Sequence, residues 1–300
     1  MNKFNIGIAR QFSLLGEQMS ESIRKTWEAA RPSLTQLKAR IVEYDFPSLL
    51  PYFKELGEIL KKAEDIALRY KSIIVELGYP PHRDVPVEFV RHIVHDYEQY
   101  GKEYVAEYID ELMFTYYDEQ VISEMSLKWE NENLAKSRIH ILRNAIKCHN
   151  QMMYDASIPT LLPQLEGVIA EAFDHNEKFN GYHMKVYLKN LLIKNLSDND
   201  LSLTDALYNF YIQHILANFE HGKEIGSDVS RNAILHGGDK NYGKQSNSLK
   251  LILLFDFLIT VLNNIPEEVI QSARAEFEEN KLKKEEKERL NYERLKKKFG

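Results

Sequence analysis

Apolar residues recur with the spacing of an α-helix in almost every patterned segment of this 300-residue chain. One such stripe runs from Ile59 to Leu77 and ends at Gly78, with the Pro80–Pro81 pair just beyond it. Residues three and four positions apart share one face of a helix, so the stripe predicts an amphipathic helix that ends before the prolines. No segment alternates between apolar and polar side chains over the length of a strand. The sequence therefore predicts an all-α protein.

Further helices are predicted on both sides of a polar segment at residues 128–137. Before it, a helix should begin after Pro86, and the apolar stripe resumes after Gly101. The helices predicted after it cover residues 135–153, 158–173, 203–220 and 249–264. Ser202, with Asp205 three residues later, resembles the capping box that opens a helix. Several helices joined by modest loops favour a helical bundle.

Composition divides the chain at two places. KWENENLAKS at 128–137 is polar and offers a joint, and residues 266–300 carry ten Lys or Arg against nine Glu. Opposite charges at i,i+4 spacing are typical of a solvated single helix or a frayed tail. The final RLKKKFG could contact RNA, although a solubilising tail is the simpler interpretation. We expect an N-terminal helical region of unknown role over 1–130, a helical bundle over 131–265, and a charged helix or tail over 266–300.

Composition also excludes several classes of protein. A net charge of −6 argues against a surface built for duplex DNA, although a local basic patch could still bind RNA. The single cysteine, Cys148, excludes an internal disulfide and is typical of a reducing cytoplasm. The N-terminal MNKFNIGIARQFSLLGEQ lacks the features of a secretory signal, and LILLFDFLITVL at 251–262 is interrupted by Asp256 and too short to span a bilayer. We therefore expect a cytoplasmic protein without a membrane partner, in which residues 251–262 form a buried helix.

The stretch SRNAILHGG at 230–238 places a guanidinium, an amide and an imidazole close together in sequence, before two glycines. RNA carries its own nucleophile, the ribose 2′-hydroxyl. A metal-free ribonuclease needs a group that transfers protons near pH 7 and a cation that stabilises the charge on the phosphate. His236 and Arg231 fit these two roles, and Asn232 could orient either of them. On a regular helix the five-residue spacing sets Arg231 and His236 about 140° apart, so they would flank a groove unless the two glycines unwind the end.

A second sequence in which Arg-Asn is followed shortly by His, RNAIKCH, runs from Arg143 to His149, six residues apart instead of five. It lies within a long amphipathic run, where a surface arginine and a surface histidine are the ordinary interpretation. Arg231 instead lies between two polar, glycine-containing loops, and functional sites are often built at such places on a rigid frame. The motif at 231–236 is therefore the preferred candidate site, and whether RNAIKCH contributes stays open.

The residues RNAILH resemble the Arg-(Asn/Asp/His)-x3-His motif of the HEPN superfamily, small helical bundles that include many RNA-cleaving toxins and antiviral effectors. The likeness covers residues 135–265. It includes the apolar segment LKLILLFDFLI and the earlier segment IPTLLPQLEGVIAEAF, both of which are similar to bundle helices of bacterial members.

The resemblance implies a site and a reaction. Arg231 and His236 would be catalytic, with Asn232 as the adjacent polar residue, and Glu166 on a neighbouring predicted helix could support them. A buried or capping carboxylate is the alternative role for Glu166. Family members generally pair two domains around one cleft, which implies a homodimer. The reaction would be cleavage of an RNA substrate by the 2′-hydroxyl without a metal or any other cofactor, leaving a cyclic phosphate and a 5′-hydroxyl.

Other patterns have simpler explanations. His92, His95 and Asp96 fall at helical spacing in HIVHD and could ligate a metal from one face, but no further ligand is evident, so we expect no metal site. GGDKNYGK at 237–244 lacks the Gly-Lys-Ser/Thr order of a phosphate-binding loop, and no predicted strand precedes it. Over residues 223–250, five basic residues stand against three acids, a small positive bias that a solvated loop would also give.

Two functions are compatible with this sequence. The preferred one is an endoribonuclease that acts as a toxin or an anti-phage defence effector, with a protein partner that neutralises or activates it. The alternative is a non-catalytic helical interaction or scaffold protein that binds a protein or RNA partner, in which Arg231 only caps or pairs within the bundle.

Overall fold

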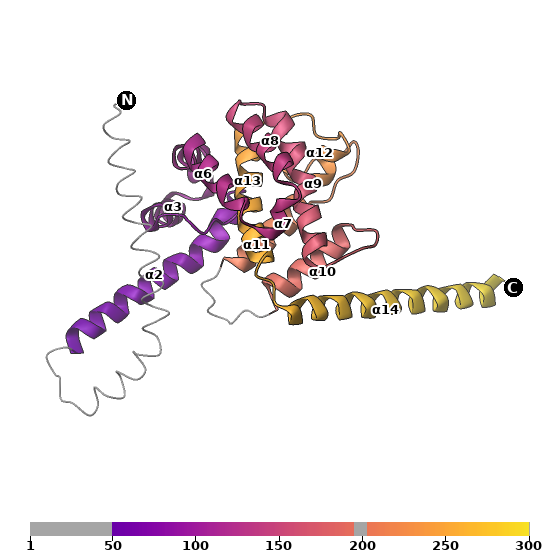
Figure 1. The fold of residues 1–300 in the computed structure, drawn as a ribbon. Coiled ribbons are helices and arrows are strands. Elements are labelled where there is room, and N and C mark those ends of the chain that lie inside the picture. Colours follow the sequence, from indigo (N-terminus) through magenta and orange to yellow (C-terminus); the bar gives the residue numbers. More distant parts are fainter. Residues whose placement is uncertain (1–49, 195–202, 300) are drawn as a thin grey trace. The chain divides into compact units, whose positions relative to one another are not determined.

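The computed structural model describes residues 50–194 and 203–299 (Figure 1). Over these residues the chain forms thirteen α-helices and one π-helical turn and no strand, which confirms the prediction of an all-α protein. The N-terminal segment MNKFNIGIARQFSLLGEQ, for which no secretory signal is expected, lies outside the described residues. The chain falls into two compact units: the first holds the described residues up to Leu77 with His82–Tyr108, and the second holds Gly78–Pro81 with the described residues from Ile109 onward.

The first unit is a small helical assembly. Its helices are α2 (Leu50–Glu76), α3 (Val87–Tyr100) and α4 (Lys102–Ala106). α3 begins directly after Pro86 and ends at Gly101, whose φ of 88° is readily adopted only by glycine. α2 packs against α3, with the rings of Tyr70 and Phe89 edge to face at 6.5 Å between centroids.

The second unit is a larger bundle. Its elements are α5 (Ile109–Tyr116), α6 (Glu119–Trp129), α7 (Asn133–Lys136), α8 (Ile139–Asn150), α9 (Tyr154–Ala172), α10 (Gly181–Leu192), α11 (Thr204–Phe210), the π-helical turn η1 (Tyr211–Ile215), α12 (Arg231–Leu235), α13 (Gln245–Leu262) and α14 (Glu267–Phe299). α9 packs along both α8 and α13, and these three helices form the centre of the unit (Figure 1).

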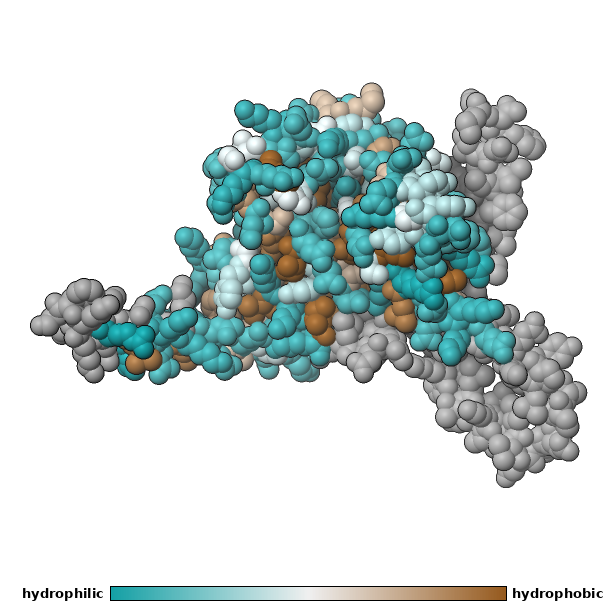
Figure 2. Space-filling model, turned by 180° about the vertical axis from the view of Figure 1, so that it is seen from behind, coloured by the Kyte–Doolittle hydropathy of each residue, from teal (hydrophilic) through white to brown (hydrophobic). Residues whose placement is uncertain are grey.

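α13 is the buried apolar helix that the sequence predicts. Among the described helices it is the one whose length and hydropathy would allow it to cross a membrane, but 72% of it is buried inside the unit. The Asp256 carboxylate that interrupts its apolar run accepts a hydrogen bond from the Trp129 indole Nε1 at 2.7 Å, so the charge has a partner inside the protein. The face shown in Figure 2 is mainly hydrophilic, with apolar side chains visible in separate groups.

The polar segment 128–137 belongs to the second unit. α6 extends through Trp129 and α7 occupies residues 133–136, and Trp129 and Ala135 are both buried. The Glu132 carboxylate also accepts a hydrogen bond from the Asn263 amide beyond α13. The two compact units divide between Tyr108 and Ile109, whereas the polar composition predicted a joint at 128–137. Composition alone does not show that two residues of this segment, Trp129 and Ala135, are buried.

The predicted helix at 203–220 is shorter than expected. α11 covers Thr204–Phe210, and the backbone then widens into η1 and leaves the helical conformation at Leu216. Leu203 is the N-cap of α11, and its side chain makes no capping hydrogen bond. The predicted capping box involves Ser202, which lies outside the described residues. A capping box is present instead at the start of α10, between Asn180 and His183.

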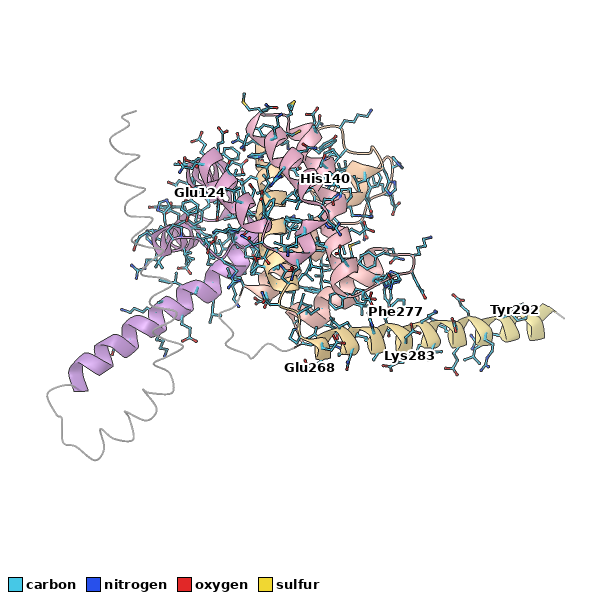
Figure 3. The ribbon with its side chains drawn as sticks, in the orientation of Figure 1. Glu124, His140, Glu268, Phe277, Lys283 and Tyr292 are labelled. Carbon is cyan, nitrogen blue, oxygen red and sulfur yellow. The ribbon has the colours of Figure 1, made fainter. Side chains whose placement is uncertain are left out.

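The charged C-terminal segment is helical over the whole of α14. Its first turns pack against α10, whereas the described side chains from 281 to 290 are exposed. Figure 3 labels Phe277 on the packed part and Lys283 and Tyr292 farther along the helix. Lys283 forms the expected i,i+4 ion pair with Glu279 at 2.5 Å.

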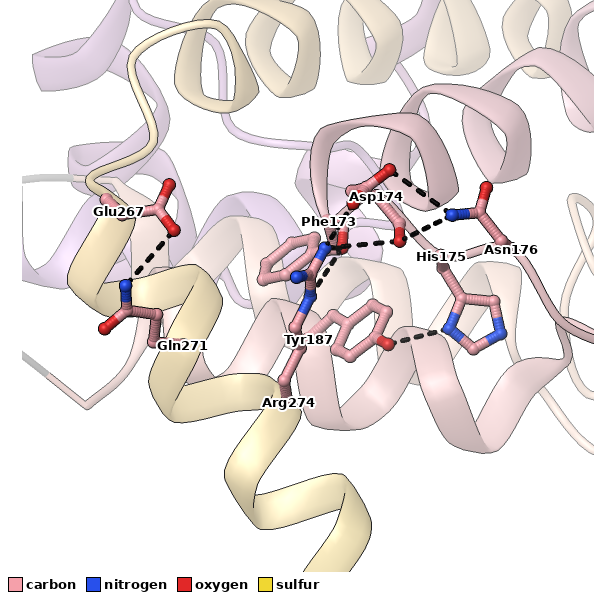
Figure 4. A network of polar contacts seen from close by, with 8 residues as sticks. All are labelled: Phe173, Asp174, His175, Asn176, Tyr187, Glu267, Gln271 and Arg274. Carbon is pink, nitrogen blue, oxygen red and sulfur yellow. Dashed lines mark hydrogen bonds and ion pairs between the residues drawn. The ribbon is translucent and has the colours of Figure 1, made fainter.

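Arg274 fastens the start of α14 to the end of α9 (Figure 4). Its guanidinium donates to the Phe173 carbonyl at 2.9 and 3.2 Å and to the Asp174 carboxylate at 2.8 Å. A cation here satisfies carbonyls that a helix end leaves without partners. His175 follows directly, and its Nδ1 lies 2.7 Å from the Tyr187 hydroxyl on α10. The ends of α9, α10 and α14 are thus joined by polar contacts.

Candidate functional site

The preferred motif lies on α12, a five-residue helix whose start is fixed by Ser230. The Ser230 hydroxyl accepts a hydrogen bond from the Ala233 N–H at 3.4 Å and donates one to the Ala217 carbonyl at 3.3 Å. Serine suits this position because its side chain satisfies an N–H that the first turn leaves unpaired. Ser230 is fully buried, so the cap holds the adjacent Arg231 at a fixed place on the bundle.

Two glycines end α12 directly after His236. Gly237 has a φ of 71°, and its N–H donates to the Ile234 carbonyl at 3.1 Å, while the Gly238 N–H donates to the Ala233 carbonyl at 2.8 Å. This pair of bonds is a Schellman motif, which satisfies the last carbonyls of a helix. The glycines therefore place His236 at the C-cap of a short helix.

Replacing Gly237 with alanine is expected to lower the free energy of unfolding by about 1–2 kcal/mol, because an alanine Cβ strains the left-handed backbone. A Cβ at this position would meet no heavy atom within 4 Å, so backbone strain is the whole effect. Chemical denaturation checks the value. Gly237→Asn is the matched control and should cost less than half as much, since asparagine tolerates this conformation. Equal losses for the two variants would contradict the account.

Arg231 is held by two side chains. Its Nη2 forms an ion pair with the Glu166 carboxylate on α9, and its Nη1 donates to the Asn232 Oδ1 at 2.9 Å. The Arg231 and Glu166 side chains are 21% and 20% exposed, so the pair is shielded but reachable from solvent. The Arg231 Nε is buried without a hydrogen-bond partner in the described chain. The guanidinium is thus oriented at two of its three nitrogens and keeps some donor capacity.

Tyr211, on the π-helical turn η1, lies beside this ion pair. Burial raises the pKa of the Tyr211 hydroxyl, and the Glu166 carboxylate raises it further, whereas the Arg231 charge lowers it. The hydroxyl donates to the Met184 Sδ at 3.2 Å. Tyr211 therefore stays protonated and uncharged at neutral pH. Single π-helical turns are frequent at functional sites.

His236 lies at the opposite end of α12 from Arg231. Its side chain is exposed, and it forms no hydrogen bond with the part of the chain that the structure describes. The structure thus brings Arg231, Asn232 and Glu166 together and leaves His236 outside that cluster. Both ends of the helix are capped, so the spacing between Arg231 and His236 is set by the fold.

The second motif, RNAIKCH, has a different geometry. Arg143 is 61% exposed and pairs with Glu130 at 2.6 Å, as expected of a surface arginine. His149 is buried, so the expectation of a surface histidine is wrong: its Nδ1 lies 2.8 Å from the Ser248 hydroxyl. Burial lowers the pKa of His149 to about 4, so the imidazole is neutral near pH 7. Arg143 and His149 point to different environments and form no joint site.

The other candidate patterns acquire ordinary roles. His92 Nε2 lies 3.5 Å from the Asp96 carboxylate, which also accepts a hydrogen bond from the Tyr108 hydroxyl at 2.8 Å. No group of three or more His, Cys, Asp or Glu side chains in the described ranges is arranged to hold a metal ion. The loop at 237–244 leads into α13, with Lys244 at the N-cap.

The basic residues near α12 do not form an open patch. Lys223 and Lys244 pair with carboxylates at 2.5 and 3.3 Å, and Arg231 pairs with Glu166. Lys250 is buried, with its ammonium 4.9 Å from the centre of the Tyr79 ring, and burial lowers its pKa. The small positive bias of residues 223–250 is therefore largely neutralised or buried.

Sequence reasoning missed two residues that shape this site. The sequence does not indicate the position of Tyr211, because a π-helical turn has no amino-acid composition that distinguishes it from an α-helix. Phe219 packs so closely that a Cβ on Gly238 would lie 2.0 Å from its Cζ, and this tertiary contact has no counterpart in local sequence.

Comparison of the chain with protein-family models, curated proteins and solved structures finds no match. The resemblance to the HEPN superfamily therefore rests on the sequence alone.

Proposed function

We propose that the chain is a metal-independent endoribonuclease of the HEPN type, in which Arg231 and His236 act on an RNA phosphodiester. The observation that carries the proposal is the arrangement on α12. A guanidinium is oriented by Glu166 and Asn232 at one end, and an exposed imidazole is held at the other. An oriented cation and an accessible proton-transfer group are what 2′-hydroxyl attack on phosphorus requires.

The reaction proceeds by in-line displacement. The ribose 2′-oxygen forms a bond to phosphorus as the bond to the 5′-oxygen breaks, and a 2′,3′-cyclic phosphate and a 5′-hydroxyl result. A neutral imidazole accepts the 2′-hydroxyl proton, and a protonated group supplies a proton to the departing 5′-oxygen. His236 takes one of these roles. Arg231 binds the non-bridging oxygens, and the phosphate competes with Glu166 for the Nη2 donor.

A second copy of the chain supplies the other proton-transfer group. One α12 carries one exposed histidine of this motif, whereas the displacement moves two protons. In the proposed homodimer a two-fold axis sets two α12 helices around one cleft, so that one His236 acts as base and its counterpart as acid. A cytoplasmic toxin or anti-phage effector, neutralised or activated by a protein partner, is the biological setting that the motif favours.

Cleavage of a mixed single-stranded RNA by the purified full chain tests the function. We expect fragments to accumulate at the same rate in the presence of EDTA, because Arg231 supplies the positive charge that a metal would otherwise provide. Expression in a bacterial host should slow growth for the wild type and not for His236→Ala. Intact RNA after prolonged incubation at high enzyme concentration would contradict the proposal.

The competing function is a non-catalytic helical scaffold. It is favoured by the internal ion pair between Arg231 and Glu166, which would explain the arginine without RNA. A scaffold does not explain why His236 is exposed at a capped helix end and makes no hydrogen bond with the described residues. The cleavage assay distinguishes the two functions, because a scaffold would not cut RNA. A scaffold would also bind its partner equally well after His236→Ala.

A further inference from the structure

A cavity of about 690 Å³ opens between the start of α10 and the packed part of α14, away from α12 in sequence. The described residues that line it are Asn180, Tyr182, His183, Phe277, Asn280 and Lys281. Pockets that hold small ligands commonly have volumes of about 300–1,000 Å³ and combine aromatic walls with a few polar groups. Neither Arg231 nor His236 is among the lining residues, so the cavity is a separate feature.

Aromatic rings form the wall of this cavity. The Phe277 ring lies 4.7 Å from the His183 ring and 6.3 Å from the Tyr182 ring, measured between centroids. Phe277 is labelled on α14 in Figure 3. Its contacts with the His183 and Tyr182 rings join α14 to α10. Tyr182 is 48% exposed although it belongs to this cluster, so part of its side chain is accessible to a ligand. A planar ligand could stack on an accessible tyrosine ring, because stacking needs no hydrogen-bond geometry.

His183 is a buried polar group that faces the cavity. It is 8% exposed, and its Nδ1 is occupied by the capping box, 3.1 Å from the Asn180 N–H. Its Nε2 forms no hydrogen bond with the residues that the structure describes. Burial lowers the pKa of His183, and the nearby His175 lowers it further, whereas Glu177 raises it. The His183 ring therefore lines the cavity with one nitrogen that makes no hydrogen bond with the described residues.

The rim carries polar groups without partners. The Asn280 amide and the Lys281 ammonium form no hydrogen bond or ion pair within the described ranges. Lys281 is the charged member of the described lining, and no carboxylate is part of it. An amide can pair with the edge of a base, and an ammonium can pair with a phosphate.

We propose that this cavity binds a nucleotide unit, with its base stacked on Tyr182 and in contact with Phe277, and its phosphate paired with Lys281. The rings supply the stacking surface, His183 and Asn280 supply polar contacts to the base or sugar, and Lys281 supplies the charge. A free mononucleotide and one residue of an RNA strand both carry this combination of base, sugar and phosphate. The proposal stands on the cavity and does not depend on cleavage at α12.

Isothermal titration calorimetry on the full chain tests the site with adenosine monophosphate, adenosine and ribose 5-phosphate. We expect adenosine monophosphate to bind most tightly. Tyr182→Ala should weaken it about tenfold or more, the loss expected from removing one stacking ring. Lys281→Ala should weaken adenosine monophosphate but not adenosine. The matched controls are Tyr292→Ala and Lys283→Ala, exposed residues of the same types on α14 outside the lining.

The outcomes separate cleanly. Failure of adenosine monophosphate to bind at millimolar concentration, or equal affinity in Tyr182→Ala and Tyr292→Ala, would overturn the proposal. Ribose 5-phosphate binding as tightly as adenosine monophosphate would also overturn it, since the base would then contribute nothing. A short oligoadenylate that binds more tightly than the mononucleotide, and loses affinity in Tyr182→Ala, identifies an RNA strand as the occupant; the reverse order identifies a free nucleotide. Arg231→Ala should keep full affinity, so this test is independent of the nuclease test.

Discussion

His236→Ala should lower the rate of RNA cleavage by about 10²–10⁴-fold, the contribution usual for a positioned proton-transfer group. The residue is exposed and makes no hydrogen bond with the described chain, so its loss should leave stability unchanged. Arg231→Ala should lower the rate by about 10²–10³-fold, because it removes the donor that stabilises charge on the phosphate. Rates from a fluorescently labelled RNA, with thermal unfolding measured in parallel, check both values.

Arg143→Ala is the matched control for this prediction. It removes an arginine from the other candidate motif, RNAIKCH, at a side chain that is 61% exposed and paired only on the surface. The control should retain the wild-type rate. A loss of cleavage in Arg143→Ala together with normal cleavage in His236→Ala would mean that the wrong motif was assigned.

Trp129→Ala should lower the free energy of unfolding by about 3–5 kcal/mol, the loss typical of a large buried aromatic. Trp129 is 1% exposed, its ring packs on Phe255 at 4.9 Å, and its Nε1 donates to Asp256. The change removes this packing and leaves the Asp256 carboxylate without its indole donor. Chemical denaturation with a fit to the transition midpoint and slope measures the loss.

Two variants divide the Trp129 effect into its parts. Trp129→Phe keeps a ring and removes the hydrogen bond to Asp256, so it should cost about 1–3 kcal/mol. Leu127→Ala, on the same helix at 60% exposure, should change stability by less than about 0.5 kcal/mol. A loss below 1 kcal/mol for Trp129→Ala would show that α6 does not depend on this contact.

Most of the helical fold could be predicted because a helix leaves a local pattern in the sequence, with apolar residues three and four positions apart. The apolar run around Asp256 predicts a buried helix, and α13 has that role. The sequence could not reveal that Trp129, in a polar segment, is the partner that allows a carboxylate there. The extent of helix 203–220 was overestimated because the apolar pattern continues across η1, where the backbone hydrogen bonding changes.

The candidate site could be predicted in composition but not in contacts. The spacing of Arg231 and His236 is visible in the sequence, and the two glycines after them predict a helix end. That Glu166 pairs with Arg231, or that His149 is buried, depends on how helices far apart in sequence pack. The cavity between α10 and α14 has no sequence signature, because its rings come from two helices whose pairing is a tertiary event.

End-group analysis of the RNA fragments tests the central claim most directly. Products made by the wild-type chain in EDTA are expected to carry 2′,3′-cyclic phosphates and 5′-hydroxyls, and a substrate with a 2′-deoxy sugar at the cut site should remain intact. Fragments that end in 3′-hydroxyls and 5′-phosphates, or a deoxy-substituted substrate that is cut as fast as RNA, would contradict attack by the 2′-hydroxyl at Arg231 and His236.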